Sequence, residues 1–397
     1  MKPIYKTVQL ASSIHWVGVE DWQSRLFDSL IPLPYGTSYN SYLVVGQEKV
    51  ALIDTVHAGF TDEWLNKIIS KAAPGKIDYL VMNHGEPDHG GSISRIMAEA
   101  PDIKLVLTEK GAPIAKKFYG VGDERTMVVK DGDTIDLGGK TLRFIEAPWV
   151  HWPETMFTFV PEDRVLFSCD FFGTHLASDL LFDDEVGELV VVQAKRYFAD
   201  IMMPLIAMAG KALEKAKACD PLIIGPSHGP VWRNPGRIFS AYDKWINGPL
   251  LKKAVIIHVS MYGATARLAE VITKSISAEG VEAVPYNLVN ADTSHIAGDL
   301  LDCSVIVFGA PTVTGNVHPV GSFGLILLKY LRPRTKKVAL FSSYGWSGGA
   351  MTQMKAQVDA LGFETIGTLE VQGPPSEEEI DQAIQLGKQI AGNILGK

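Results

Sequence analysis

Cysteine is scarce in this 397-residue chain, which contains only Cys169, Cys219 and Cys303. Three scattered cysteines exclude a disulfide framework, and none belongs to a Cys-x-x-Cys pair that could hold a metal ion. Runs of about 18 apolar residues are also missing, so the sequence predicts no membrane-spanning helix. The amino terminus has no apolar core of the signal-peptide type. These absences favour a protein of a reducing cytoplasm.

Positive charge is in short supply as well. The 37 lysines and arginines are outnumbered by 45 aspartates and glutamates, and the net charge is −8. Because nucleic-acid-binding proteins usually carry a basic patch, we expect no nucleic-acid partner. Apolar residues make up 46% of the chain, which is ample for large cores. Since single cores rarely exceed about 250–300 residues, we expect two domains.

Short strand-like segments dominate the first part of the chain, and several are close enough in sequence to form hairpins of a mixed sheet. The predicted strands are 14–19, 41–45, 50–54, 77–82, 103–108, 126–130, 141–146, 156–160, 164–170 and 222–225. Helices are expected to begin near Thr61 and Ser92. A long amphipathic segment predicts one further helix at 197–219.

From about residue 251 onward, short apolar strands alternate regularly with helices, which predicts a doubly wound parallel sheet. Gly248 and Pro249 punctuate the chain just before this change. We therefore place the two domains at residues 1–249 and 250–397. The expected strands are 253–260, 303–309 and 337–343, and the expected helices are 264–279, 322–331 and 349–361. A last helix opens with capping-box spacing at 376 and 379 and runs to about 395.

The segment 83–91 concentrates potential metal ligands, because His84, Glu86, Asp88 and His89 lie within six residues. It follows an apolar run that is typical of a buried strand. The alternation at 84, 86 and 88 would put three side chains on one side of an extended segment. Neighbouring carboxylates repel each other unless a positive charge lies between them. The cluster therefore favours a cation site over an ordinary polar loop.

Three more candidate ligands, His151, Asp170 and His228, stand at the ends of later strands. Alone, each would more often be a solvated or capping group. Together with the first cluster they supply four imidazoles and three carboxylates, enough for a dinuclear site. A ligand set without thiolate favours iron, manganese or zinc. Cys169 is not expected to ligate, since consecutive strand residues face opposite ways.

On these residues, the stretch from about Tyr39 to Trp232 resembles the metallo-β-lactamase superfamily, an αββα sandwich with the motif His-x-His-x-Asp-His and later His, Asp and His ligands. Asp54 occupies the place of the family's early strand-end aspartate, and we interpret it as structural or as lying outside the ligand shell. Glu86 stands where the motif has its second histidine. The resulting pattern resembles the flavodiiron proteins, in which the lactamase fold holds a non-haem diiron centre.

The resemblance implies a role for each of the seven candidates. It implies that His84, Glu86 and His151 hold one iron. It also implies that Asp88, His89 and His228 hold the second iron and that Asp170 bridges the two. Within the family the counterpart of His89 does not always ligate.

Three loops of the second half follow predicted strands, at the edge where doubly wound sheets bind ligands. Hydroxyls and backbone N–H groups before a helix make the first loop a candidate phosphate site, and aromatic rings in the third could pack beside a flat ring. The alternative is ordinary turns. Residues 253–395 resemble flavodoxin, which implies non-covalent FMN at Ser260, Met261, Tyr262, Gly263, Ala264, Thr265, Pro311, Thr312, Val313, Asn316, Ser343, Tyr344, Gly345, Trp346, Ser347 and Gly348.

A lactamase-like domain followed by a flavodoxin domain is the order found in flavodiiron proteins. The resemblance implies reduction of O2 to water, of NO to N2O, or both, with electrons passing from FMN to the irons. It also implies a homodimer or homotetramer, in which each flavin lies beside the partner's irons. Because the chain ends soon after the last predicted helix, we expect no fused rubredoxin domain. A separate donor is then needed, for which we expect rubredoxin, with reduced F420 as the alternative.

Two other functions fit parts of the pattern. The first is a zinc hydrolase of the lactamase type with a flavodoxin-like appendage, although Glu86 argues against it. The second is an electron carrier whose metal site is only structural. His175, five residues after Asp170, would either line a gas pocket or cap a turn. The ligand set alone does not decide between O2 and NO.

Overall fold

The computed structural model describes residues 6–397, and the chain forms two compact units that meet between Ile246 and Asn247. Within the described range, no helix is both long enough and apolar enough to cross a bilayer. The domain boundary placed between residues 249 and 250 from the sequence stays a prediction.

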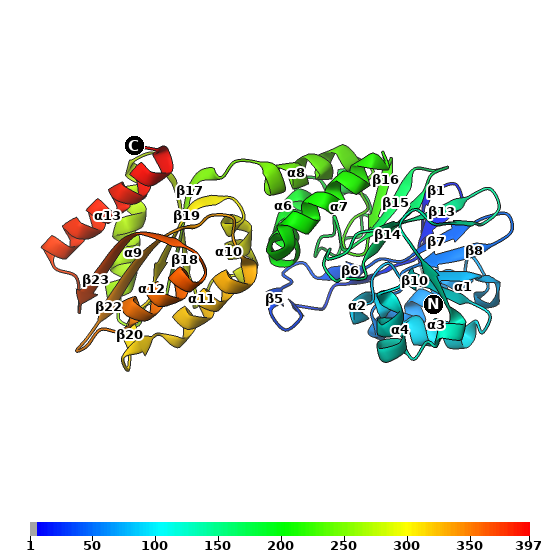
Figure 1. Cartoon of the computed structure of the whole chain (residues 1–397), viewed down its shortest axis with the longest axis horizontal. Coiled ribbons are helices and arrows are strands. Elements are labelled where there is room, and N and C mark those ends of the chain that lie inside the picture. Colours follow the sequence, from blue (N-terminus) through cyan, green and yellow to red (C-terminus); the bar gives the residue numbers. More distant parts are fainter. Residues whose placement is uncertain (1–5) are drawn as a thin grey trace. The chain divides into compact units, whose positions relative to one another are not determined.

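The first unit is built on two sheets with helices along their outer faces (Figure 1). The seven-stranded sheet contains, in spatial order, β1 Val8–Ala11, β2 Ile14–Trp16, β7 Tyr42–Val45, β8 Val50–Ile53, β9 Tyr79–Val81, β10 Lys104–Thr108 and β11 Thr126–Val129. The five-stranded sheet contains β12 Thr134–Asp136, β13 Thr141–Glu146, β14 Met156–Val160, β15 Val165–Cys169 and β16 Ile223–Pro226. Antiparallel hairpins lead into parallel strands in the first sheet, so the predicted mixed sheet is confirmed.

Period-two alternation builds two cores from the same strands. Leu43 and Leu52 face the helices on the outer side of the first sheet. Tyr42, Val44 and Ile53 face the second sheet and share a core with its apolar side chains. Both faces of the seven-stranded sheet are therefore buried, which fixes the strand ends that carry the candidate ligands.

The helices of this unit are α1 Thr61–Ile69, α2 Pro87–Gly90, α3 Ile93–Glu99, α4 Gly111–Tyr119, α5 Asp183–Val186, α6 Leu189–Tyr197, α7 Ile206–Ala218 and α8 Pro235–Asn247. The helix starts expected near Thr61 and Ser92 are confirmed. The single helix predicted at 197–219 is wrong. A π-helix at Phe198–Met202 and a 3₁₀ turn at Met203–Leu205 separate α6 from α7, because Pro204 lacks the N–H that a continuous helix needs.

The strand predicted at 14–19 is also wrong as one element. It divides into β2 and β3, which pair with different strands. The small sheets of this region are β3 Val19–Asp21 with β6 Thr37–Tyr39, and β4 Leu26–Phe27 with β5 Ile31–Pro32.

The second unit is a five-stranded parallel sheet with helices on both faces, as predicted (Figure 1). Its strands, in spatial order, are β18 Glu282–Asn287, β17 Leu251–His258, β19 Cys303–Gly309, β22 Lys337–Tyr344 and β23 Glu364–Gln372. A small hairpin joins β20 Thr312–Val313 to β21 Asn316–Val317. The helices are α9 Ala264–Ala278, α10 Thr293–Leu300, α11 Pro319–Leu331, α12 Ala350–Ala360 and α13 Glu377–Leu395.

Helices α9 and α13 pack against each other on one face of the sheet (Figure 1). The capping box expected at Ser376 and Glu379 opens α13 and is confirmed. Sequence reasoning missed β18, β23 and α10. Both strands lie at the sheet edges and are only partly buried, and β18 contains Pro285, which interrupts an apolar strand pattern.

Candidate metal centre

The loop after β9 carries the first four candidate ligands. Glu86 lies in extended backbone, but Pro87 then begins the short helix α2, where its missing N–H has no cost. The expectation that positions 84, 86 and 88 share one side of an extended segment is therefore wrong. The helical turn sends Asp88 and His89 to a different group from His84 and Glu86.

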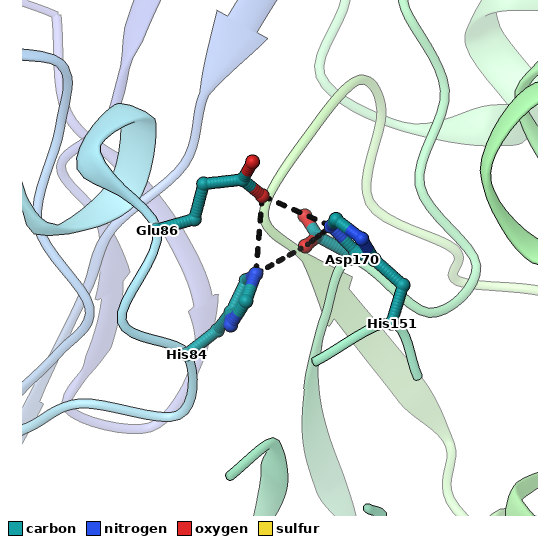
Figure 2. A group of neighbouring side chains, drawn as sticks. All are labelled: His84, Glu86, His151 and Asp170. Atoms are coloured by element: carbon teal, nitrogen blue, oxygen red, sulfur yellow. Dashed lines mark hydrogen bonds and ion pairs between the residues drawn. The ribbon is translucent and has the colours of Figure 1, made fainter. Parts of the chain in front are cut away.

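Figure 2 shows the first group, in which His84, Glu86, His151 and Asp170 converge from separate parts of the chain. The Nε2 atoms of His84 and His151 lie 3.1 Å and 2.9 Å from Glu86 Oε2. Each of these two nitrogens also lies 3.4 Å from Asp170 Oδ2. All four potential ligand atoms lie within 4.8 Å of one another.

The second group consists of Asp88, His89 and His228, and all three side chains are buried. Asp88 Oδ2 lies 3.2 Å from His89 Nε2 and 3.0 Å from His228 Nε2. Asp170 reaches this group through its other oxygen, Oδ1, which lies 2.8 Å from His89 Nε2. Asp170 therefore presents one carboxylate oxygen to each group.

Cys169 lies closer to the centre than expected. Its sulfur and the ligand atoms of His89 and Asp170 lie within 4.8 Å of one another, so Cys169 does not face away from the centre as expected. The reason is local backbone, since Cys169 has a positive φ of 51° and the strand register shifts between Phe167 and Cys169. Burial, aided by the charges of Asp170 and Asp54, raises the pKa of the Cys169 thiol well above its usual value. A thiolate is disfavoured there.

Buried polar atoms show that the two groups fit metal ions. Both carboxylate oxygens of Asp88 and of Asp170, and both ring nitrogens of His89, have no hydrogen-bond partner in the described chain. Buried polar atoms are almost always paired in folded proteins. Cations at the two groups would satisfy the oxygens and His89 Nε2 at once, so the donor set fits a dinuclear metal centre.

The electrostatics point the same way. Burial alone would lower the pKa of His89, but the charges of Asp170 and Asp88 outweigh it and raise that pKa to about 9. Burial also opposes protonation of His151, yet the nearby carboxylates of Asp170 and Glu86 raise its pKa to about 9. The cluster thus attracts positive charge strongly, and protons and metal ions compete for the same atoms.

Further contacts orient two of the imidazoles, and sequence reasoning missed them. His84 Nδ1 lies 2.7 Å from the buried carboxylate of Glu154. His228 Nδ1 donates a 2.7 Å hydrogen bond to the carbonyl oxygen of Ser38. Glu154 follows His151 by three residues, which was the available signal. The contact with Ser38 is made by its backbone carbonyl, so the residue type at position 38 could not predict it.

The remaining candidates near the centre also have positions. Asp54 belongs to neither group and accepts hydrogen bonds from Asn83 N and Nδ2 at 2.8 Å and 3.0 Å. It thereby fixes the residue before His84. His175 is buried, with its ring centroid 5.2 Å from that of His228 and its Nδ1 3.2 Å from Thr37 Oγ1. It packs beside the second group.

The three predicted flavin loops lie at the ends of β17, β19 and β22, which are neighbours in the parallel sheet of the second unit. Gly263 has a positive φ of 95° and precedes α9, and its N–H donates to Ser260 Oγ. The hydroxyls of Thr265 and Ser343 are 2.8 Å apart and join the first loop to the third. Thr312 Oγ1 accepts a hydrogen bond from Ala350 N and ties the second loop to α12.

Two aromatic side chains of these loops are unusually exposed, Tyr262 at 95% and Trp346 at 80%. Large exposed apolar side chains rimmed by polar groups mark ligand or partner sites. A Cβ atom added at Gly263 or Gly345 would meet no other atom of the described chain within 4 Å. The loops therefore offer open space and flat surfaces, which fits a bound flavin.

Comparisons with known proteins match both units. The ODP family beta lactamase model matches residues 37–229, and the Flavodoxin model matches residues 256–387. A nitric oxide reductase of Moorella thermoacetica is 37% identical over 98% of this chain and 98% of its own. A coenzyme F420H2 oxidase of Methanothermobacter marburgensis is 34% identical over 97% of this chain and 98% of its own.

Solved structures agree over the whole chain. The rubredoxin oxygen:oxidoreductase from Desulfovibrio gigas has a TM-score of 0.95 and 29% identity, covering 98% of this chain and 99% of that one. The flavodiiron protein from Giardia intestinalis has a TM-score of 0.95 and 31% identity, covering 100% and 98%.

These matches confirm the fold class predicted from the sequence and the oxidoreductase function. The flavodoxin unit implies FMN, and the seven clustered side chains support a non-haem diiron centre. A lactamase-type zinc hydrolase is not favoured. The chain belongs to the flavodiiron protein family.

Proposed function

We propose that the protein reduces O2 to water, NO to N2O, or both, at the centre formed by the two ligand groups. The position of Asp170 is the observation that carries this proposal, since its two buried oxygens face separate ligand groups and have no hydrogen-bond partner in the described chain. We assign His84, Glu86 and His151 to one iron and the second group to the other, with Asp170 bridging. Relatives named as a nitric oxide reductase and as oxidases support both gases as substrates.

When bound, the irons and FMN supply the redox chemistry, in which four electrons and four protons convert O2 to two waters, or two electrons and two protons convert two NO to N2O and water. The protein holds the site in shape. Asp54 fixes Asn83 before the ligand loop, and the Ser38 carbonyl keeps the His228 proton on Nδ1. His228 Nε2 is thereby left as a lone-pair donor directed at the second group.

The FMN assignment follows the three loops. We propose that the phosphate lies on residues 260–265, where N–H groups stand before α9. The ring would lie between residues 311–316 and 343–348, with Trp346 and Tyr344 as candidate stacking partners. The hydrogen bond between Thr265 and Ser343 supports one continuous site, because it ties the first loop to the third.

Electron supply and assembly complete the proposal. We infer a separate donor, either rubredoxin or reduced F420, because the named relatives and structural neighbours include proteins that use each. We also propose a homodimer or homotetramer in the cytoplasm. Sedimentation velocity of the active protein measures the assembly, and a fully active monomer would contradict that part.

The decisive experiment is anaerobic stopped-flow mixing of the photoreduced protein with O2 and, separately, with NO. Iron and FMN are quantified on the same sample, and iron-depleted protein with intact FMN is the control. We expect flavin reoxidation by at least one gas to require iron. Equal rates in the iron-depleted control, or a protein that takes up zinc but no iron, would refute the proposal. Steady-state assays with reduced rubredoxin or reduced F420 then identify the donor.

A further inference from the structure

Glu154 is a buried carboxylate beside the centre that has no role in the ligand set. It lies in the loop between His151 and β14, with 2% of its surface exposed. Its Oε1 accepts a 2.7 Å hydrogen bond from His84 Nδ1 and a 3.0 Å bond from Gly85 N. A buried carboxylate is costly unless its surroundings need the charge. Glu154 therefore needs an explanation.

The two ligand groups differ in what stands behind their imidazoles. His84 has a carboxylate behind it, whereas His228 has the neutral carbonyl of Ser38. His89 Nδ1 has no hydrogen-bond partner among residues 6–397. Contacts with Glu154 therefore add a full negative charge on one side of the centre only. The second oxygen of Glu154 also lacks a hydrogen-bond partner in that range, so no other cationic group is bound to it there.

A second contact shows that the loop itself is held independently of the carboxylate. The carbonyl oxygen of Glu154 accepts a 2.9 Å hydrogen bond from Thr108 Oγ1, which comes from the end of β10. The loop thus has a backbone anchor on one side, while the side chain turns to His84 on the other. This separation allows the two roles of residue 154, loop anchoring and ring orientation, to be tested apart.

We propose that Glu154 is a positioning residue that holds His84 with its proton on Nδ1 and strengthens Nε2 as a metal ligand. Carboxylates behind metal-binding histidines fix the ring tautomer and raise ligand basicity. Among His84, His89 and His228, only His84 has a carboxylate at its Nδ1 in the described chain, so the two metal positions are electronically unequal. The position held by His84 favours the more highly charged ion. This proposal rests on the proposed assignment of His84 as a ligand.

Two variants of Glu154 and one control test the proposal. Glu154→Ala removes the acceptor, and we expect one of the two irons to bind roughly 10–100-fold more weakly. Glu154→Gln keeps an oxygen for His84 Nδ1 and Gly85 N but removes the charge. We expect it to hold two irons, with the midpoint potential of the centre raised and the EPR spectrum of the half-reduced protein changed. Thr108→Val removes the backbone anchor of the same loop and should leave all three readouts as in the wild type.

Chelator competition, redox titration and EPR provide these readouts, and thermal unfolding of the metal-free variants checks that each is folded. If Glu154→Gln matches the wild type in potential and spectrum, the proposal is overturned while the ligand assignment stands. If Thr108→Val reproduces the effects of Glu154→Gln, loop anchoring explains them and the proposal is again overturned. If the wild type itself fails to hold two irons, the ligand assignment fails and the role of Glu154 falls with it.

Discussion

The metal centre and the flavin loops are built in opposite ways. The side chains of His84 and Asp170 are 0% and 1% exposed, and the contacts around them join residues far apart in sequence, such as Ser38 and His228. The flavin loops, in contrast, expose Tyr262 and Trp346 almost fully. Each flavin loop lies between the end of one strand of the parallel sheet and the next helix.

This difference shows where each site gets its shape. The metal centre is formed by the packing of two sheets, which brings its ligand atoms together, and several of these atoms have no hydrogen-bond partner in the described chain. The flavin site is formed by local loops at one sheet edge, whose surfaces need the ligand to cover them. We therefore expect the two sites to fail separately. Asp170→Ala, Gly349→Ala and Glu20→Gln test that independence.

The largest effect is expected for Asp170→Ala. Without this carboxylate, the two groups lose the shared charge that offsets two cations. Gas consumption should fall by more than about 100-fold, the upper range for loss of a residue that only orients a ligand. FMN content should not change, because the flavin loops belong to another unit. Iron and FMN per chain and the rate of gas consumption are measured on one preparation.

The matched control is Asp62→Ala, which removes an exposed carboxylate of the same unit. It should keep iron, FMN and activity. Loss of FMN in Asp170→Ala would break the claim that the sites are independent. Unchanged gas consumption by that variant would instead favour an electron carrier with a structural metal site.

Gly349→Ala should have a smaller effect, and it should weaken FMN binding while leaving the iron content unchanged. A Cβ at residue 349 would lie 2.2 Å from Gly315 O, and Gly349 has a positive φ of 152°. The methyl group would therefore push the second and third flavin loops apart. A cost of about 1–3 kcal/mol is typical of such overpacking, and a cost of about 2 kcal/mol would weaken FMN binding about 30-fold. Fluorescence titration with FMN measures this, and iron content should stay at the wild-type value.

Gly298→Ala is the control, since a Cβ there meets no atom within 4 Å in the described chain and Gly298 lies inside α10. It should bind FMN as the wild type does. Loss of iron from Gly349→Ala would show that the sites are coupled.

The sequence predicted the seven clustered metal-site residues because their chemistry is rare and their spacing is distinctive. His84 and His228 were identifiable as strand-end histidines, although 144 positions separate them. The division between the groups was not predictable, because it depends on the helical turn that Pro87 begins. The position of Cys169 depends in the same way on one left-handed backbone residue.

The hydrogen bonds made behind the ligand side chains were also not predictable from the sequence. Glu154 looks like any polar loop residue, and only the folded chain shows its carboxylate behind His84. Edge strands such as β18 were missed because partial burial leaves no continuous apolar run. What the sequence encodes poorly is therefore the local backbone and the partner chosen by a buried polar group, rather than which domains are present.

The smallest effect concerns Glu20, a half-buried carboxyl group of the first unit. Glu20 accepts a hydrogen bond from Ser178 N. Burial, opposed by that bond and by Lys67 but helped by Asp179 and Glu63, raises its pKa to about 8. Its usual value is about 4.3. Because the folded-state pKa is the higher one, the stabilising contribution is complete below about pH 4.3 and is lost as the pH rises through about 8.

Glu20→Gln should flatten this dependence, because an amide accepts from Ser178 N without carrying a charge. We expect equal unfolding midpoints for variant and wild type at acidic pH and a higher midpoint for the variant at pH 9. Tryptophan fluorescence reports mainly on the first unit, which contains seven of the eight tryptophans, all except Trp346. Glu48→Gln, at an exposed turn, should show no such difference. FMN release should keep the same pH profile in all three proteins, and a parallel shift there would mean that the two units unfold as one.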